Sequence, residues 1–427
     1  MSIGLISFLI CFVLIFVIRL PIALGMIAAS TYYMIAAGMD VTMVADQILS
    51  NLMSQYLLIA VPLFVFTANV MNSGVVTDKI FSFASACIGR RRGGMGHVNV
   101  LASIIFSGMT GSAVADASGL GAMEIKAMRK AGFDDGFSCA ITAASSTIGP
   151  IFPPSIPMIL YAMLSGASIG KLFIGGMLPG LMLGGALMMY ISYISTKRNY
   201  PRGQSYTLKQ FLSMSWSAIP ALFTMVVLLG GIYSGIVTPT EAAALAALYA
   251  LVISFFVYRC LSFSDLLNII KETAKTTGVL TSIVASAYAF SFIVSIENIP
   301  EMIGNQLLGI TDNPLVLLLI INLIFLILGM FLDTTVILLV FIPMVLPVVG
   351  ELGIDLVHFG VVVVMNMMIG LSTPPFGILL FIVSGISGTK LQSVIKEIAP
   401  MFVAMLVVLL LITFFPSLTL WLPNLIG

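Results

Sequence analysis

Two stretches of glycine, proline and hydroxyl residues interrupt long apolar runs of the chain, at 145–154 and at 370–375. A helix that crosses a bilayer should not contain them, because proline removes a backbone donor and clashes with the preceding turn. Broken backbone is tolerated at membrane depth only where protein covers it or where it lines a cavity. Paired breaks in two halves of a chain indicate a transport site. We therefore expect these breaks to hold a substrate and its coupling ions.

The composition is that of an integral membrane protein. Of the 427 residues, 60% are hydrophobic and 8% are charged, whereas a soluble domain carries about 25% charged residues. Because one crossing takes ~20 residues, the apolar runs predict roughly ten to twelve passages or hairpin insertions. The four cysteines are scattered, without the spacing of a metal site or disulfide framework. No nucleotide loop or nucleophile constellation is present, so we expect no ATP binding, no nucleic-acid binding and no enzymatic activity.

The chain contains an internal repeat at an offset of 221 residues, which carries Gly149 onto Gly370. Further pairs at this offset are Gly108 and Gly329, Gly132 and Gly353, Asp134 and Asp355, Pro153-Pro154 and Pro374-Pro375, and Pro179 and Pro400. So many pairs without a gap indicate a duplicated unit, which is a common way to build a secondary transporter.

The basic residues predict that the two copies are inverted. They flank the first hairpin candidate, 98–123, on both sides, within 90–92 and 126–130. Cytoplasmic loops collect Lys and Arg, so this run must enter and return as a re-entrant hairpin. In the second copy no Lys or Arg occurs from 276 to 389, which places its hairpin, roughly 314–349, on the opposite face. The predicted fold class is therefore an all-α polytopic membrane protein with inverted repeats, two re-entrant helical hairpins and two broken helices.

In each copy the hairpin tip and the helix break should meet near the bilayer midplane. A half-helix presents N–H groups to an anion at its N-terminus and carbonyls to a cation at its C-terminus. Sodium is a hard cation that prefers oxygen ligands. The first sodium site is expected from Ser103, Ser107, Gly108, Thr147 and Gly149, and the second from Gly329, Thr334, Thr335, Gly370 and Thr373.

The candidates for substrate binding are Ser112, Asp116, Ser145, Asp333, Asn366 and Ser372. Each has a structural alternative. Hydroxyls in membrane helices often bond back to their own backbone. Asp333 has the position of an N-cap as well as that of an ion ligand. Asp116 is an intramembrane carboxylate, functional by default, and is equally placed to cap the second arm of its hairpin.

Four motifs resemble the large membrane subunit of tripartite ATP-independent periplasmic (TRAP) transporters, over essentially the whole chain. They are Phe106-Ser-Gly-Met-Thr-Gly-Ser-Ala-Val-Ala-Asp-Ala-Ser-Gly-Leu-Gly121, Gly149-Pro-Ile-Phe-Pro-Pro-Ser155, Gly235-Ile-Val-Thr-Pro-Thr-Glu-Ala-Ala-Ala244 and Gly370-Leu-Ser-Thr-Pro-Pro-Phe-Gly377. The resemblance implies sodium-driven uptake of an organic acid, of the sialic acid or C4-dicarboxylate type, across the bacterial inner membrane. It also implies a periplasmic substrate-binding protein and a separate small four-helix membrane subunit as partners.

The resemblance further implies an elevator fold of the ion-transporter superfamily, in which hairpins and broken helices move against a scaffold within the lipid bilayer. The implied division is scaffold helices at 1–77, an amphipathic arm at 78–89, a first transport-domain half at 90–182, scaffold helices at 183–261, a second arm at 262–275, a second transport-domain half at 276–399 and a C-terminal helix at 400–427.

Three other classes compete with this interpretation. A stand-alone sodium-coupled carboxylate or anion transporter of the same superfamily would need no binding protein. A channel would normally show a continuous polar stripe or a ring of charges, which the sequence lacks. A membrane scaffold or sensor would not need two symmetric breaks at the midplane.

Overall fold

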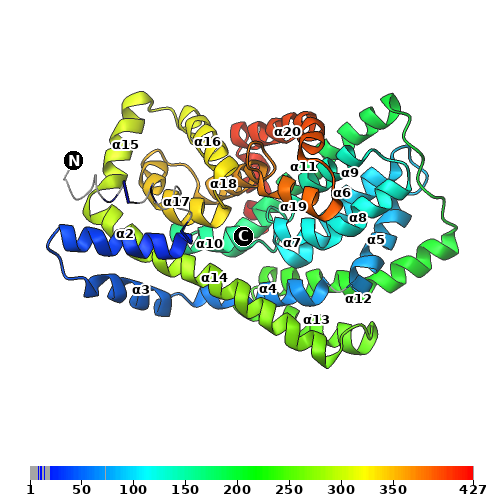
Figure 1. Ribbon diagram of the computed structural model, residues 1–427, viewed down its shortest axis with the longest axis horizontal. Coiled ribbons are helices and arrows are strands. Elements are labelled where there is room, and N and C mark those ends of the chain that lie inside the picture. The colour runs from blue at the N-terminus through cyan, green and yellow to red at the C-terminus, as the bar shows by residue number, and fades with distance from the viewer. Residues whose placement is uncertain (1–7, 9, 12–13, 15–19, 73, 427) are drawn as a thin grey trace.

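The computed structural model describes residues 8, 10–11, 14, 20–72 and 74–426, and every regular element among them is a helix. Most of the first apolar run, 3–18, therefore lies outside the described residues. Figure 1 shows two layers, which we call the lower layer (22–88 and 208–296) and the upper layer (94–197 and 299–426). Each layer combines segments that lie far apart in the chain.

The lower layer is organised around α14, which crosses the width of the molecule and packs against α2, α3 and α4 (Figure 1). Its helices are α2 (Ile22–Ala36), α3 (Thr42–Ser54), η1 (Tyr56–Ile59), α4 (Ala60–Met71), α5 (Gly74–Ile88), α12 (Leu208–Tyr233), α13 (Pro239–Val252), the π-helical η2 (Ile253–Val257) and α14 (Phe263–Ile296).

The upper layer holds the hairpins and the broken helices. Its helices are α6 (Gly94–Thr110), α7 (Ala113–Ser118), α8 (Leu120–Lys130), α9 (Asp135–Ser146), α10 (Ile156–Ser165), α11 (Ile169–Lys197), α15 (Ile299–Ile310), α16 (Pro314–Phe331), α17 (Thr334–Glu351), α18 (Leu356–Leu371), α19 (Ile378–Ser387), α20 (Leu391–Phe414) and α21 (Ser417–Ile426). The first hairpin is α6 with α7 and α8, and the second is α16 with α17. The broken helices are α9 with α10 and α18 with α19.

By length and composition, seven helices among the described residues could cross a membrane, or up to eight if α3 and the η1–α4 segment, bent by 70°, are one span. Shorter apolar helices such as α10, α18 and α19 add half-spans. This confirms the prediction of an all-α polytopic protein.

The predicted repeat is confirmed in the helix bounds. Adding 221 to the bounds of α6 gives 315–331, against 314–331 for α16, and adding it to the span of α7 and α8 gives 334–351, the bounds of α17. Both breaks contain a cis Pro-Pro bond, at Pro153-Pro154 and at Pro374-Pro375.

The copies differ in the outgoing arm of the hairpin. In the second copy it is one helix, but in the first it breaks at Gly119, between α7 and α8. A Cβ on Gly119 would lie 2.1 Å from Oδ1 of Asn72, which follows α4. The side-chain amide of Asn72, in the lower layer, thus occupies the space that a side chain at position 119 would need.

Four of the predicted domain boundaries fall inside continuous helices. The boundaries at 77, 182, 275 and 399 lie within α5, α11, α14 and α20. The change from polar to apolar residues near 275 alters the surroundings of α14 but does not end the helix. Gly278 does not end it either, because one glycine lowers helix stability by only ~1 kcal/mol. The amphipathic arm at 262–275 is therefore the first part of a 34-residue helix.

Ion pairs fasten the two copies to each other at one end of the upper layer. Arg198, after α11, contacts Asp134 of the first copy at 3.2 Å and Glu397 of the second at 2.9 Å. Tyr200 donates to the same Asp134, and burial together with this bond raises the pKa of its hydroxyl. Arg129 Nη1 donates to the Ser387 carbonyl at 2.9 Å. The upper layer is thus held together across the repeat.

Candidate functional site

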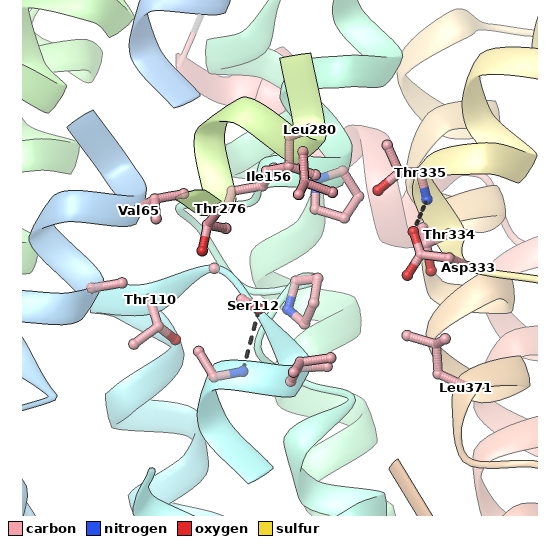
Figure 2. Close-up of a pocket in the computed structure, with 18 of the residues that line it drawn as sticks. Val65, Thr110, Ser112, Ile156, Thr276, Leu280, Asp333, Thr334, Thr335 and Leu371 are labelled. Atoms are coloured by element: carbon pink, nitrogen blue, oxygen red, sulfur yellow. Dashed lines mark hydrogen bonds between the residues drawn. The ribbon is translucent and has the colours of Figure 1, made fainter. Parts of the chain in front are cut away.

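A cavity of about 410 Å³ lies between the two hairpin tips and the lower layer (Figure 2). Upper-layer residues on its wall belong to both hairpins and both breaks, and α4 and α14 form the facing wall. Its polar lining residues are Asn69, Thr110, Ser112, Thr276, Asp333, Thr334 and Thr335. Asp333 is the one ionisable side chain among the described residues that line this cavity. The cavity thus brings both hairpin tips and both breaks to one space.

The tip of the first hairpin is a tight turn at Gly111 and Ser112. Gly111 has φ +60°, the left-handed region that glycine adopts without strain. A Cβ on it would lie 2.5 Å from the Pro154 carbonyl oxygen, so hairpin and break are in direct contact. The Ser112 side chain caps the next helix by accepting from Ala115 N at 3.3 Å. The tip of the first hairpin therefore packs directly against the first break at Gly111.

The tip of the second hairpin is capped by Asp333, whose Oδ1 accepts from Thr335 N at 2.8 Å (Figure 2). The N-cap alternative for Asp333 is therefore realised, and its other carboxylate oxygen remains available to a ligand. The hydroxyl oxygen of Thr334 is buried and has no hydrogen-bond partner in the described part of the chain. Because buried polar groups are normally paired, Thr334 is a strong candidate ligand for an ion.

Glycines bring the second hairpin and its break together. A Cβ on Gly370 would lie 2.8 Å from Gly329 Cα, so α16 and α18 meet backbone to backbone. In the first copy, a Cβ on Gly149 would lie 3.5 Å from the Ser112 carbonyl, which again puts tip and break side by side. Gly108 differs, because a Cβ there would lie 2.4 Å from Met225 Sδ of α12. Its side-chain position faces the lower layer and not the break.

Four of the predicted hydroxyls donate to carbonyls of their own helix, as the structural alternative expects. Ser107 donates to Ile104 O and Thr147 to Ala144 O, both at 2.6 Å, while Ser372 and Thr373 donate to Ile369 O at 2.9 and 2.7 Å. A hydroxyl that donates keeps two oxygen lone pairs. These bonds therefore fix where the oxygens lie and leave them able to face a cation.

A buried polar network joins the first hairpin to α9. Ser103 donates to Ser145 Oγ at 3.2 Å, and Ser145 donates to Asn99 Oδ1 at 2.8 Å. The Asn99 amide donates to Glu124 Oε2 and to Thr142 Oγ1, both at 2.7 Å. Glu124 is 1% exposed. Its position directly after the apolar run 98–123 was the available signal for a buried carboxylate.

Asp116 lies in this packing and not on the cavity wall. It is 1% exposed, neither carboxylate oxygen is hydrogen-bonded within the described residues, and the hydroxyls of Ser103 and Ser146 lie near it. It does not cap the outgoing arm, because Ser112 holds that position. Its assignment to substrate binding stays a prediction, and the cavity does not favour it.

The second copy has a corresponding but uncharged network. Asn366, which the offset of 221 pairs with Ser145, donates to the Asn322 carbonyl at 2.8 Å and to Asn322 Oδ1 at 2.9 Å. Asn322 donates in turn to Thr413 at 2.9 Å. Asn366 thus holds α18 to α16 beside the site, outside the cavity lining.

The cavity therefore gathers only part of the predicted set. Ser112, Asp333, Thr334 and Thr335 line it, whereas the remaining candidates lie behind the tips and breaks. Asn69 and Thr276, on the facing wall, were missed. Asn69 Nδ2 donates to Thr273 Oγ1 at 3.0 Å, which ties α4 to α14 beside the cavity. A polar residue within the apolar run 56–72 was the available signal.

Comparison with known proteins decides the family. The sequence model described as "Tripartite ATP-independent periplasmic transporter, DctM component" matches residues 9–418. The chain belongs to this DctM family. It is a large permease subunit and a multi-pass protein of the inner membrane. The TRAP resemblance seen in the motifs is thereby confirmed.

DctM-family relatives match along most of their length. The sialic acid TRAP transporter large permease SiaM of Vibrio cholerae is 42% identical, over 95% of both chains. The C4-dicarboxylate large permease DctM of Pseudomonas aeruginosa is 38% identical, over 87% of both. The sialic acid permease SiaT of Haemophilus influenzae is 39% identical, over 98% of this chain and 68% of its own.

A solved structure shares the fold. The Alcanivorax borkumensis YdaH transporter aligns with a TM-score of 0.64 over 88% of this chain and 87% of its own, at 12% identity. At that identity the likeness concerns the arrangement of the helices alone.

Proposed function

We propose that this DctM-family subunit carries an organic acid into the cell by sodium-coupled secondary transport. The observation that carries the proposal is the cavity at the two hairpin tips. Its described lining contains no Lys, Arg or His, and its one ionisable group is the carboxyl of Asp333. An organic anion would add negative charge beside this carboxylate, so it needs a cation bound with it. Relatives named for sialic acid, C4-dicarboxylates and 2,3-diketo-L-gulonate support an organic acid as the substrate.

The proposed coupling uses two sodium sites, one in each copy, between the hairpin tip and the helix break. In the first, Ser103, Ser107, Thr147 and the backbone at Gly108 and Gly149 offer oxygens. In the second, Thr334, Thr335, Thr373 and the backbone at Gly329 and Gly370 do so. The contact between Gly329 and Gly370 brings backbone carbonyls within reach of one ion. Bound sodium would offset the charges of the substrate and of Asp333.

We further propose that the upper layer moves as one body against the lower layer. The bonds of Arg198 and Arg129 across the two copies support this, since Arg198 joins the end of α11 to α9 and α20, and Arg129 joins α8 to α19. A separate small membrane subunit would cover part of the lower layer, and a periplasmic binding protein would deliver the acid. The family description, which names a tripartite periplasmic transporter, supports both partners.

The test is uptake into proteoliposomes that contain this chain and its small subunit. With binding protein and substrate outside, we expect an inward sodium gradient to drive accumulation, and its removal to stop it. Undiminished uptake without sodium would contradict the coupling. Equal uptake of free substrate without binding protein would favour the stand-alone transporter.

Thr334→Val tests the second sodium site. Valine keeps the shape of threonine but removes the buried, unpartnered hydroxyl oxygen, so we expect the sodium concentration for half-maximal uptake to rise about tenfold, which corresponds to ~1.4 kcal/mol of lost interaction. Thr196→Val is the matched control, because Thr196 is exposed on α11 and donates only to Ser192 O. Wild-type sodium dependence in Thr334→Val would remove this residue from the site.

A further inference from the structure

Two loops on the predicted cytoplasmic side are joined into a short antiparallel bridge. The loop before α6 (89–93) meets the linker after α11 (198–207), with Arg92 opposite Arg202. Both loops connect one layer to the other. Two backbone bonds close the bridge, from Gly93 N to Pro201 O at 3.0 Å and from Gly203 N to Arg91 O at 2.9 Å.

Glycines hold the two loops at very close range. A Cβ on Gly203 would lie 2.3 Å from the Gly89 carbonyl oxygen, and one on Gly94 would lie 2.6 Å from Gly203 Cα. Real side chains do not fit at such distances, so the backbones touch. The backbones that carry the arginines are therefore held together by this packing.

This geometry gathers like charges. The arginine cluster consists of Arg90, Arg91, Arg92 and Arg202, all of them exposed. Like charges directly opposite one another on paired strands are destabilising. The ion pairs among the described residues are made by Arg129 and Arg198, and none involves an arginine of the cluster. The arrangement calls for an anion from outside the chain.

An apolar surface follows the cluster along the chain, at the start of α12, six residues after Arg202. Leu208, Leu212 and Trp216 are 74%, 58% and 78% exposed, and their spacing of four puts them on one helix face. Acyl chains fit such a face, and a tryptophan there is typical of the membrane interface. The cytoplasmic leaflet supplies anionic headgroups beside basic clusters.

We propose that the arginine cluster binds the headgroup phosphate of an anionic phospholipid, whose acyl chains lie along the exposed face of α12. Arginine suits this role because its guanidinium binds phosphate oxygens in a bidentate manner. The bound lipid relieves the repulsion between Arg92 and Arg202. It also fixes, at the membrane surface, the two loops through which the chain passes between the layers.

Thermal unfolding of the full chain in neutral detergent tests this site. We expect phosphatidylglycerol to raise the apparent Tm about 5 °C more than phosphatidylcholine does, and inorganic phosphate to give no such rise. The Arg92→Gln/Arg202→Gln variant should lose this specific increment. Without lipid it should melt at or above the wild-type temperature, because a repulsive pair has been removed.

Lys171→Gln is the control, since Lys171 is exposed near the far end of the 29-residue α11, ~39 Å of helix away. It should keep the phosphatidylglycerol increment. Retention of the increment by the double variant would overturn the proposal. An equal rise with inorganic phosphate would also overturn it, since the site would then bind a free anion and not a lipid. If the double variant does not fold, Arg92→Lys/Arg202→Lys keeps the charge but loses the bidentate geometry, and should bind the lipid more weakly.

Discussion

Gly370→Ala is expected to reduce sodium-driven uptake about tenfold. The added methyl group would lie 2.8 Å from Cα and 2.9 Å from the carbonyl carbon of Gly329, and backbone atoms cannot rotate away as a side chain can. The hairpin arm α16 must therefore separate from α18. Overpacking of this kind typically costs ~1–3 kcal/mol, and 1.4 kcal/mol is a factor of ten. Because the proposed ion ligands lie on both sides of this contact, their geometry is lost with it.

Gly385→Ala is the matched control, because it lies in α19 of the same copy and a Cβ there has no neighbour within 4 Å. It should transport like the wild type. It should be as stable as the wild type or slightly more so, since alanine has a higher helix propensity than glycine. Both variants are compared with the wild type by their initial uptake rates over a range of sodium concentrations. Normal uptake and normal sodium dependence in Gly370→Ala would show that the α16–α18 contact has no part in the site.

Asn99→Leu is expected to cause the largest loss of stability. Asn99 is fully buried, and it is the hydrogen-bond donor to Glu124 Oε2 and the acceptor for Ser145. Leucine would leave a buried carboxyl group without its donor, which costs about 2–5 kcal/mol. The apparent Tm of the purified chain in detergent should fall by ~5–10 °C.

A second substitution distinguishes loss of the polar partner from loss of packing. Replacing both members of a buried polar pair by apolar groups is far less costly than removing one. Asn99→Leu/Glu124→Met should therefore melt above Asn99→Leu alone. Asn51→Leu, at a half-buried position on α3 where the amide bonds only within its own helix, should change the Tm little. A double variant no more stable than Asn99→Leu would mean that the bond to Glu124 is not the source of the loss.

Much of the fold could be predicted from the sequence because the residues that the two copies share are mostly glycine and proline, which determine backbone conformation. Proline ends helices and glycine permits left-handed turns whatever surrounds them. The match between 145–154 and 370–375 therefore predicted two broken helices, and the helix bounds follow the offset of 221 closely. The hairpin of the first copy was predicted from the positions of its basic flanks, since charge at the membrane surface is a local property.

Proline and changes in polarity were less informative where a helix continues through them. Pro179 and Pro400 lie inside α11 and α20, and the polar-to-apolar change near 275 lies inside α14. A proline inside a membrane helix is tolerated when neighbouring helices satisfy the freed backbone. Whether they do depends on packing, and no local pattern in the chain reports it.

The sequence by itself determined the membrane class, the duplication, the two hairpin tips and the residues from which a site could be built. Only the tertiary structure decided which of them share a space: Ser112 and Asp333 line one cavity, Asp116 lies behind it, and Gly108 faces Met225. It also brought Asn69 and Thr276 of the lower layer to the cavity wall. The physical reason is that composition and spacing specify a helix and its faces, whereas the partner of each face follows from the packing of two layers whose segments lie far apart in the chain.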